Sequence, residues 1–140
     1  MSSRDAESVV RFLREIAGDN LRAVAQYDAT DSRRLYLRED LSAAYDDQEL
    51  DDIVAGLRAE DPQTDAIREM EEAGSLHCTV RLYDRSVTVH VKQRADFGTI
   101  VSLDPSAAGQ LTSFVSELMR VLDRHSPQQF EDAPAWMQKE

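Results

Sequence analysis

Hydrophobic residues recur at every third or fourth position in two long stretches near the ends of the chain. Residues 5–17 carry one such stripe and are followed by Gly18, which is placed to end a helix. Residues 105–122 carry the other; Asp104 can cap that helix, and Pro105 can occupy its first position. The spacing predicts a helix at each end of a folded unit, each with an apolar face turned to a core.

Two shorter helical patterns lie in the middle of the chain. Asp46 and Glu49 have the spacing of a capping box, and a single apolar stripe then runs to Leu57. Asp61 and Pro62 restart a helical pattern that continues to Gly74. Residues 46–74 are therefore predicted to form a bent helical segment.

Strict alternation of apolar and polar residues marks the strands. Residues 21–27 and 33–38 flank a turn-rich segment and predict one hairpin. Residues 76–82 and 87–92 predict a second hairpin around Asp84-Arg85, and residues 97–103 predict the strand that follows.

The predicted order is thus helix, two strands, one or two helices, three strands, helix. This order predicts a single α+β domain over residues 1–125, with a five-stranded antiparallel sheet and helices on its faces. Beyond residue 125 the pattern dissolves, and residues 126–140 are predicted to form an acidic, flexible tail. Phe130 and Trp136 are candidate anchors in this tail, which can dock in a partner's groove or fold back onto their own domain.

Composition limits the classes of protein. The chain has 140 residues, 41% of them hydrophobic, and one cysteine, so no internal disulfide can form. No apolar run reaches the roughly 18 residues of a membrane span, and no signal-peptide stretch follows the first residues. We therefore expect a cytoplasmic protein that does not enter a membrane.

The charge is unusual in kind and in position. The net charge is −11, with 16 Asp and 11 Glu against 14 Arg and only 2 Lys. An excess of Asp and a preference for Arg favour a halophile that accumulates salt; an acidic protein from a high-GC genome is the alternative. Residues 39–72 carry a net −11 by themselves, whereas residues 21–38 and 73–103 are each +2. The strands are therefore mildly basic beneath an acidic coat.

Candidate chemical groups are few. Cys78 shares the apolar register of its strand and is interpreted as a small buried hydrophobe. His77 and His90 can neighbour each other across the hairpin but lack a clear third metal ligand. The acidic run at residues 46–52 lacks the central glycine of a calcium loop, and the five glycines form no phosphate-binding motif. We therefore predict no cofactor, no metal and no enzymatic activity.

The element order resembles the roadblock/dynein-light-chain domain, a profilin-like fold, over residues 5–124. The stretches 36–40 and 101–104 also look similar to small uncharacterised haloarchaeal proteins. The roadblock resemblance implies a homodimer, formed by the third strand and the second helix, that serves as a docking or regulatory platform.

The leading hypothesis is therefore a non-enzymatic, homodimeric regulatory or scaffold module with an unidentified protein partner. A first alternative is a sensory domain that binds a small ligand between the sheet and the second helix; a sizeable apolar cavity would favour it. A second alternative is an accessory factor that binds nucleic acid through its basic strands. The net charge disfavours it, and the acidic helix can cover these strands instead. The candidate interaction surface consists of residues in the outward register, which also contains Arg22: Arg34, Tyr36, Arg38, Arg81, Tyr83, His90, Lys92 and Arg94.

Overall fold

The computed structural model describes residues 5–59 and 76–131. These residues form a five-stranded sheet, four α-helices and two short 3₁₀ helices. The elements, in chain order, are α1 (Ala6–Ala17), η1 (Gly18–Asn20), β1 (Leu21–Tyr27), β2 (Ser32–Leu37), α2 (Glu39–Ala44), α3 (Asp47–Ala59), β3 (Cys78–Leu82), β4 (Val87–Arg94), β5 (Phe97–Leu103), η3 (Pro105–Gln110) and α5 (Leu111–His125).

Local signals fix the ends of the helices as the sequence indicates. The Ser8 backbone N–H donates to the Asp5 carboxylate at 2.7 Å, which caps α1. Gly18 then ends α1 with a positive φ of 58°, a conformation that favours glycine. The predicted capping box is confirmed: the Glu49 N–H donates to Asp46 Oδ1 at 2.8 Å, and the Asp46 N–H donates to Glu49 Oε1 at 3.1 Å.

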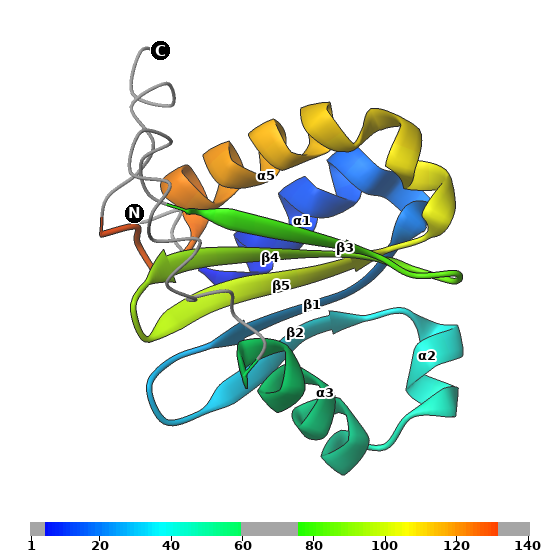
Figure 1. Cartoon of the computed structure of the whole chain (residues 1–140). Coiled ribbons are helices and arrows are strands. Elements are labelled where there is room, and N and C mark those ends of the chain that lie inside the picture. The colour runs from blue at the N-terminus through cyan, green and yellow to red at the C-terminus, as the bar shows by residue number, and fades with distance from the viewer. Residues whose placement is uncertain (1–4, 60–75, 132–140) are drawn as a thin grey trace.

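The sheet has the strand order β2-β1-β5-β4-β3, and every neighbouring pair is antiparallel. Figure 1 shows α1 and α5 side by side over one face of this sheet, and α2 and α3 on the opposite side. The predicted α+β class, with a five-stranded antiparallel sheet and helices on its faces, is therefore confirmed. The acidic helix α3 covers part of the face that carries the basic strand residues.

The main core lies between the sheet and the pair α1 and α5. Alternate residues of β4 and β5 point to this side because side chains alternate along a strand. They pack against the apolar stripes of the two terminal helices. The cluster includes Val87, Val89, Val91, Val101 and Leu103 from the sheet and Val9, Leu13, Leu118 and Leu122 from the helices.

Two details differ from the sequence-based expectations. Residues 39–44 form the short helix α2, although no helical stripe marks them. The last helix begins later than predicted: Pro105–Gln110 forms a 3₁₀ helix, α5 starts at Leu111, and the Asp104 side chain caps neither. That carboxylate is instead held by Arg38, as described below. The helix predicted at 61–74 lies outside the described residues.

The segment after α5 is docked on the sheet as far as it is described. Ser126 and Gln128 are buried. The Ser126 hydroxyl accepts from Gln26 Nε2 at 3.0 Å, the Gln128 backbone carbonyl accepts from Gln93 Nε2 at 2.8 Å, and the Glu131 N–H donates to the Gln93 carbonyl. Over residues 126–131 the structure thus differs from the predicted flexible tail, because buried amides of β1 and β4 bind this segment. Residues 132–140 lie outside the described residues.

Substitution of two glycines tests this packing. A Cβ at Gly98 would lie 2.5 Å from the Val91 carbonyl oxygen and 2.7 Å from Tyr27 Oη, whereas a Cβ at Gly56 would have nothing within 4 Å. We expect Gly98→Ala to lower the free energy of unfolding by about 1–3 kcal/mol. The control Gly56→Ala, in the exposed part of α3, should raise it by about 0.5–1 kcal/mol. Urea denaturation measures both, and equal effects would contradict the packing at Gly98.

Candidate functional site

A cavity of about 420 Å³ lies between the sheet and the acidic helices. Its floor is the sheet face that points away from α1 and α5. In the middle of β1 this face carries two alanines, Ala23 and Ala25, which pair with Ser102 and Ile100 of β5. Thr88 of β4 lies opposite Ser102. Because the side chains of β1 are small here, the floor leaves space that a Leu or Val would fill.

The roof of the cavity is formed by α2 and α3. Their apolar residues line the side of the cavity opposite the sheet: Leu41, Leu50, Ile53, Val54 and Leu57. Tyr45, between the two helices, also lines the cavity. The volume lies within the roughly 300–1,000 Å³ typical of sites for small organic molecules, and such sites are mostly apolar with a few polar groups. The apolar cavity that the ligand-binding alternative requires is thus present.

One end of the roof is anchored by a small second core. Tyr27, Leu57 and Ile100 are buried together, and Val54 packs against them. The Arg58 guanidinium lies 4.3 Å from the centroid of the Tyr27 ring, at cation–π distance. Tyr27 Oη is 2.8 Å from His90 Nε2. α3 is therefore fixed to the sheet at its C-terminal end.

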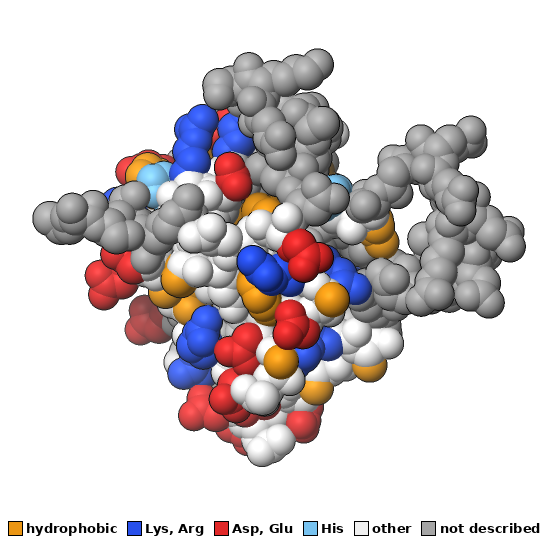
Figure 2. Space-filling model, turned by 90° about the vertical axis from the view of Figure 1, so that its left-hand side faces the viewer, with side chains coloured by type: hydrophobic (Ala, Val, Ile, Leu, Met, Phe, Trp, Pro, Cys, Tyr) orange, Lys and Arg blue, Asp and Glu red, His pale blue; other side chains and the backbone are white. Residues whose placement is uncertain are grey.

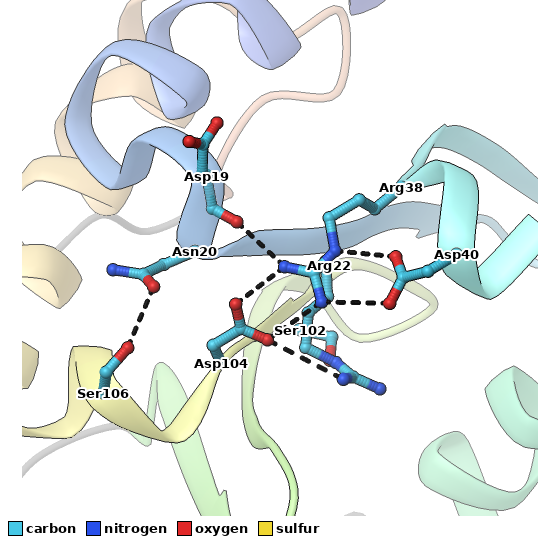
Figure 3. A network of polar contacts seen from close by, with 8 residues as sticks. All are labelled: Asp19, Asn20, Arg22, Arg38, Asp40, Ser102, Asp104 and Ser106. Atoms are coloured by element: carbon cyan, nitrogen blue, oxygen red, sulfur yellow. Dashed lines mark hydrogen bonds and ion pairs between the residues drawn. The ribbon is translucent and has the colours of Figure 1, made fainter.

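The other end is anchored by the Arg38 cluster, which consists of Arg38, Asp40, Asp104, Arg22 and Ser102 (Figure 3). Arg38 binds both oxygens of Asp104, at 2.7 and 3.0 Å, and its Nε donates to Asp40 at 2.8 Å. These hydrogen bonds raise the pKa of Arg38 and lower the pKa of Asp40.

Arg38 also reaches η1, where its Nη1 donates to the Asp19 backbone carbonyl at 2.8 Å. The guanidinium thereby connects three parts of the chain that are distant in sequence: the end of β2, the end of β5 and the turn after α1. This contact holds α2 where it leaves the sheet and so positions the roof.

Positively charged side chains outnumber negatively charged ones in the cavity wall. Three arginines line it, Arg22, Arg33 and Arg34, against one carboxylate, Asp51. The carboxylates that pair with these arginines, Asp104, Asp28 and Asp47, are not among the lining residues. Acidic side chains gather instead at the lower end of the molecule in Figure 2, where α3 lies in Figure 1.

The predicted interaction surface is not brought together in one place. His90 is buried against Tyr27. Tyr36 faces the α1 side of the sheet, where the Arg14 guanidinium lies 5.4 Å from its ring centroid. Arg38 is committed to the ion pairs above. These three residues therefore differ from the exposed positions that the alternation indicated.

The other members of that surface remain accessible but are spread over the sheet. Arg34 pairs with Asp47 of α3 at 2.8 Å, and it lines the cavity together with Tyr83. Arg81 and Lys92 are half-buried, and Arg94 is exposed with its guanidinium 5.4 Å from the Phe97 ring centroid. The structure thus brings only Arg34 and Tyr83 to a common site.

The cysteine and the histidines form no reactive centre among the described residues. Burial raises the pKa of the Cys78 thiol to about 11, so little thiolate exists at neutral pH. His77 accepts the Lys92 N–H through its backbone carbonyl, and His90 lies opposite Thr79, so the two histidines are not direct partners. Within residues 5–59 and 76–131, no group of three or more His, Cys, Asp or Glu side chains could hold a metal ion.

Of the two candidate tail anchors, Phe130 packs against the main core. It folds back onto its own domain, which is one of the two expected outcomes. Trp136 lies outside the described residues.

The sequence indicated a pocket between the sheet and the second helix only as an alternative, and no pattern marked the residues that form it. Its floor depends on the alanines of β1, which counted only as apolar positions of an alternating strand, and part of its roof is α2, which has no helical stripe. A strand with alanine at two successive positions of one face is the signal that could have found it.

Fold and site together define a small α+β domain with a partly basic, mainly apolar cavity under an acidic helical roof. No helix in the described part of the chain is long and apolar enough to cross a membrane. The chain belongs to the family described as Domain of unknown function (DUF7522), whose model matches residues 7–123. A comparison with curated proteins finds no match.

Replacing Arg38 tests the anchor of the roof. Arg38→Gln removes charge-assisted hydrogen bonds to two carboxylates, and its side chain is only 25% exposed. We expect a loss of about 1.5–3 kcal/mol in the free energy of unfolding. Arg34→Gln, whose ion pair is 46% and 86% exposed, should change it by less than about 0.5 kcal/mol. Chemical denaturation separates the two, and an equally small effect at Arg38 would show that the cluster is not an anchor.

Proposed function

We propose that this domain binds a small, largely apolar molecule in the cavity between the sheet and α2 and α3. The observation that carries the proposal is the cavity itself, about 420 Å³ in volume, walled by aliphatic side chains from both the sheet and the helices. The cavity is partly open to solvent, so its aliphatic lining lacks the apolar contacts that a packed core would provide. Occupancy by a ligand would recover those contacts.

We further propose a sensory or regulatory role without bond-making chemistry. The polar groups described in the wall are guanidinium and hydroxyl groups with one carboxylate, which suit recognition. The roof that would respond to a ligand carries the exposed acids of α2 and α3. Ligand binding would thus alter a surface that a partner protein can contact.

Filling the cavity tests this function. Ala25 lies on the floor, whereas Ala55 is exposed on α3 and does not line the cavity. The neutral dye N-phenylnaphthylamine, which fluoresces in apolar surroundings, should bind the wild type and Ala55→Trp equally. Ala25→Trp should weaken its binding at least about tenfold while keeping or raising the melting temperature. Equal dye binding by all three proteins would contradict a site in this cavity.

Self-association is a second candidate function, and the edge strand β3 favours it. Among the described residues β3 pairs only with β4, so its other edge has no described strand partner. It also exposes large apolar side chains, with Leu82 67% and Val80 36% exposed, and Tyr83 beyond its end 52% exposed. Apolar edges of this kind mark sites of strand addition. The roadblock resemblance implies a homodimer through the same strand.

The composition supports a salt-rich cytoplasm as the setting of this function. Every Asp and Glu described in residues 39–59 is exposed, as expected of acids that interact with solvent rather than with a core. Measurements of assembly are therefore best made in molar KCl, where surface charges are screened over about 3 Å.

Light scattering in molar KCl tests the dimer. We expect a mass about twice the 15.8 kDa of one chain, and Leu82→Glu should shift the protein to monomer because it places a charge in the apolar edge. Ile16→Glu, at a 37% exposed apolar position on α1, should leave the dimer intact. A wild-type monomer at all concentrations would refute self-association without affecting the cavity proposal.

A further inference from the structure

The cavity has one polar end, and Arg22 is its centre. Arg22 Nε donates to Ser102 Oγ at 3.1 Å, and its Nη1 lies 3.8 Å from Asp104. Asp104 is a weak partner for it, because both carboxylate oxygens already accept shorter hydrogen bonds from Arg38. Figure 3 shows the Arg22 guanidinium beside Ser102, with one terminal nitrogen in contact with Asp104 and the other pointing away from it.

Two hydrogen-bond donors are therefore left for a ligand at this end. No hydrogen bond from Arg22 Nη2 is present in the described part of the structure, and Arg22 is only 18% exposed. Ser102 accepts from Arg22, so its own hydroxyl proton can be donated elsewhere. Both residues line the cavity, and Thr88 adds a second hydroxyl beside Ser102.

The electrostatics of the wall favour an anion at this position. The Arg22 side chain is only 18% exposed and lies in a cavity wall made mainly of aliphatic side chains. Charge interactions are stronger in such surroundings than in water. The planar fork of Arg22 matches a carboxylate better than it matches a neutral polar group.

The floor becomes apolar within one step along β5. Ile100, two residues before Ser102 in the chain, lies on the same face about 7 Å away along the strand. Ala25 and Leu57 lie beside Ile100, at the end where α3 is anchored. A molecule with its charge at Ser102 would therefore place its remaining atoms over aliphatic side chains.

We propose that the ligand is an aliphatic monocarboxylate, held by Arg22 and Ser102 at its carboxylate and by Ile100 and Leu57 along its chain. This inference rests on the proposed function and names the ligand class for the same cavity. Arg22 acts as the residue that selects the anionic head group. Arg34, which is exposed and bound to Asp47, does not contribute to this selection.

Two probes of equal chain length test the inference: decanoate and decanol, measured by calorimetry and by displacement of N-phenylnaphthylamine. Wild-type protein should bind decanoate at least about tenfold more tightly than decanol, as expected for a charge-assisted pair. Arg22→Met should bind both probes equally by losing affinity for decanoate alone. Arg22→Lys should restore part of the preference, and the control Arg34→Met should keep all of it.

Retained decanol binding by Arg22→Met shows that the variant is folded and its cavity intact. Equal binding of the two probes by wild-type protein, or an undiminished preference in Arg22→Met, would overturn the assignment of a carboxylate while leaving the cavity proposal in place. If neither probe nor the dye binds the wild type, the proposed function itself fails.

Discussion

The central strands of this domain are buried on both faces, and this constraint determines the rest of the structure. In β5, Thr99, Val101 and Leu103 point to one side and Ile100 to the other, and all four are shielded from water. A sheet of this kind needs helices on both sides. The terminal helices cover the first face with large side chains. The second face is covered by the most acidic part of the chain, which has only one narrow apolar stripe to pack against the sheet.

The acidic coat and the basic strands described by the sequence are therefore parts of one arrangement. Arg34 of β2 meets Asp47 of α3, Arg38 meets Asp40 of α2, and the Arg58 guanidinium lies over the Tyr27 ring. Each contact joins the roof to the sheet at its margin, and the middle is left to alanines and aliphatic residues. Uneven covering of this kind explains why the cavity lies at the centre of the second face.

The sequence predicted the fold well because its signals are local. Alternation located all five strands, and the capping box at Asp46 and Glu49 placed α3. The site was harder to predict, because its residues acquire their roles only through distant partners. Arg38 lies in an outward register, yet Asp104, 66 positions away in the chain, binds it in a half-buried cluster. The same contact removes Asp104 from the capping role that its place before Pro105 suggests. No local pattern reports such exchanges of partner.

The docked segment after α5 changes where this domain ends. Helical pattern stops at His125, and the family model stops at residue 123, so a boundary drawn from either would remove Ser126 and Gln128. Those two residues satisfy amides of Gln26 and Gln93 deep in the sheet. A truncation at the last helix would remove the hydrogen-bond partners of these buried amides and expose them to water beside the main core. Anyone who fuses, shortens or grafts this domain should therefore keep the chain at least as far as Glu131.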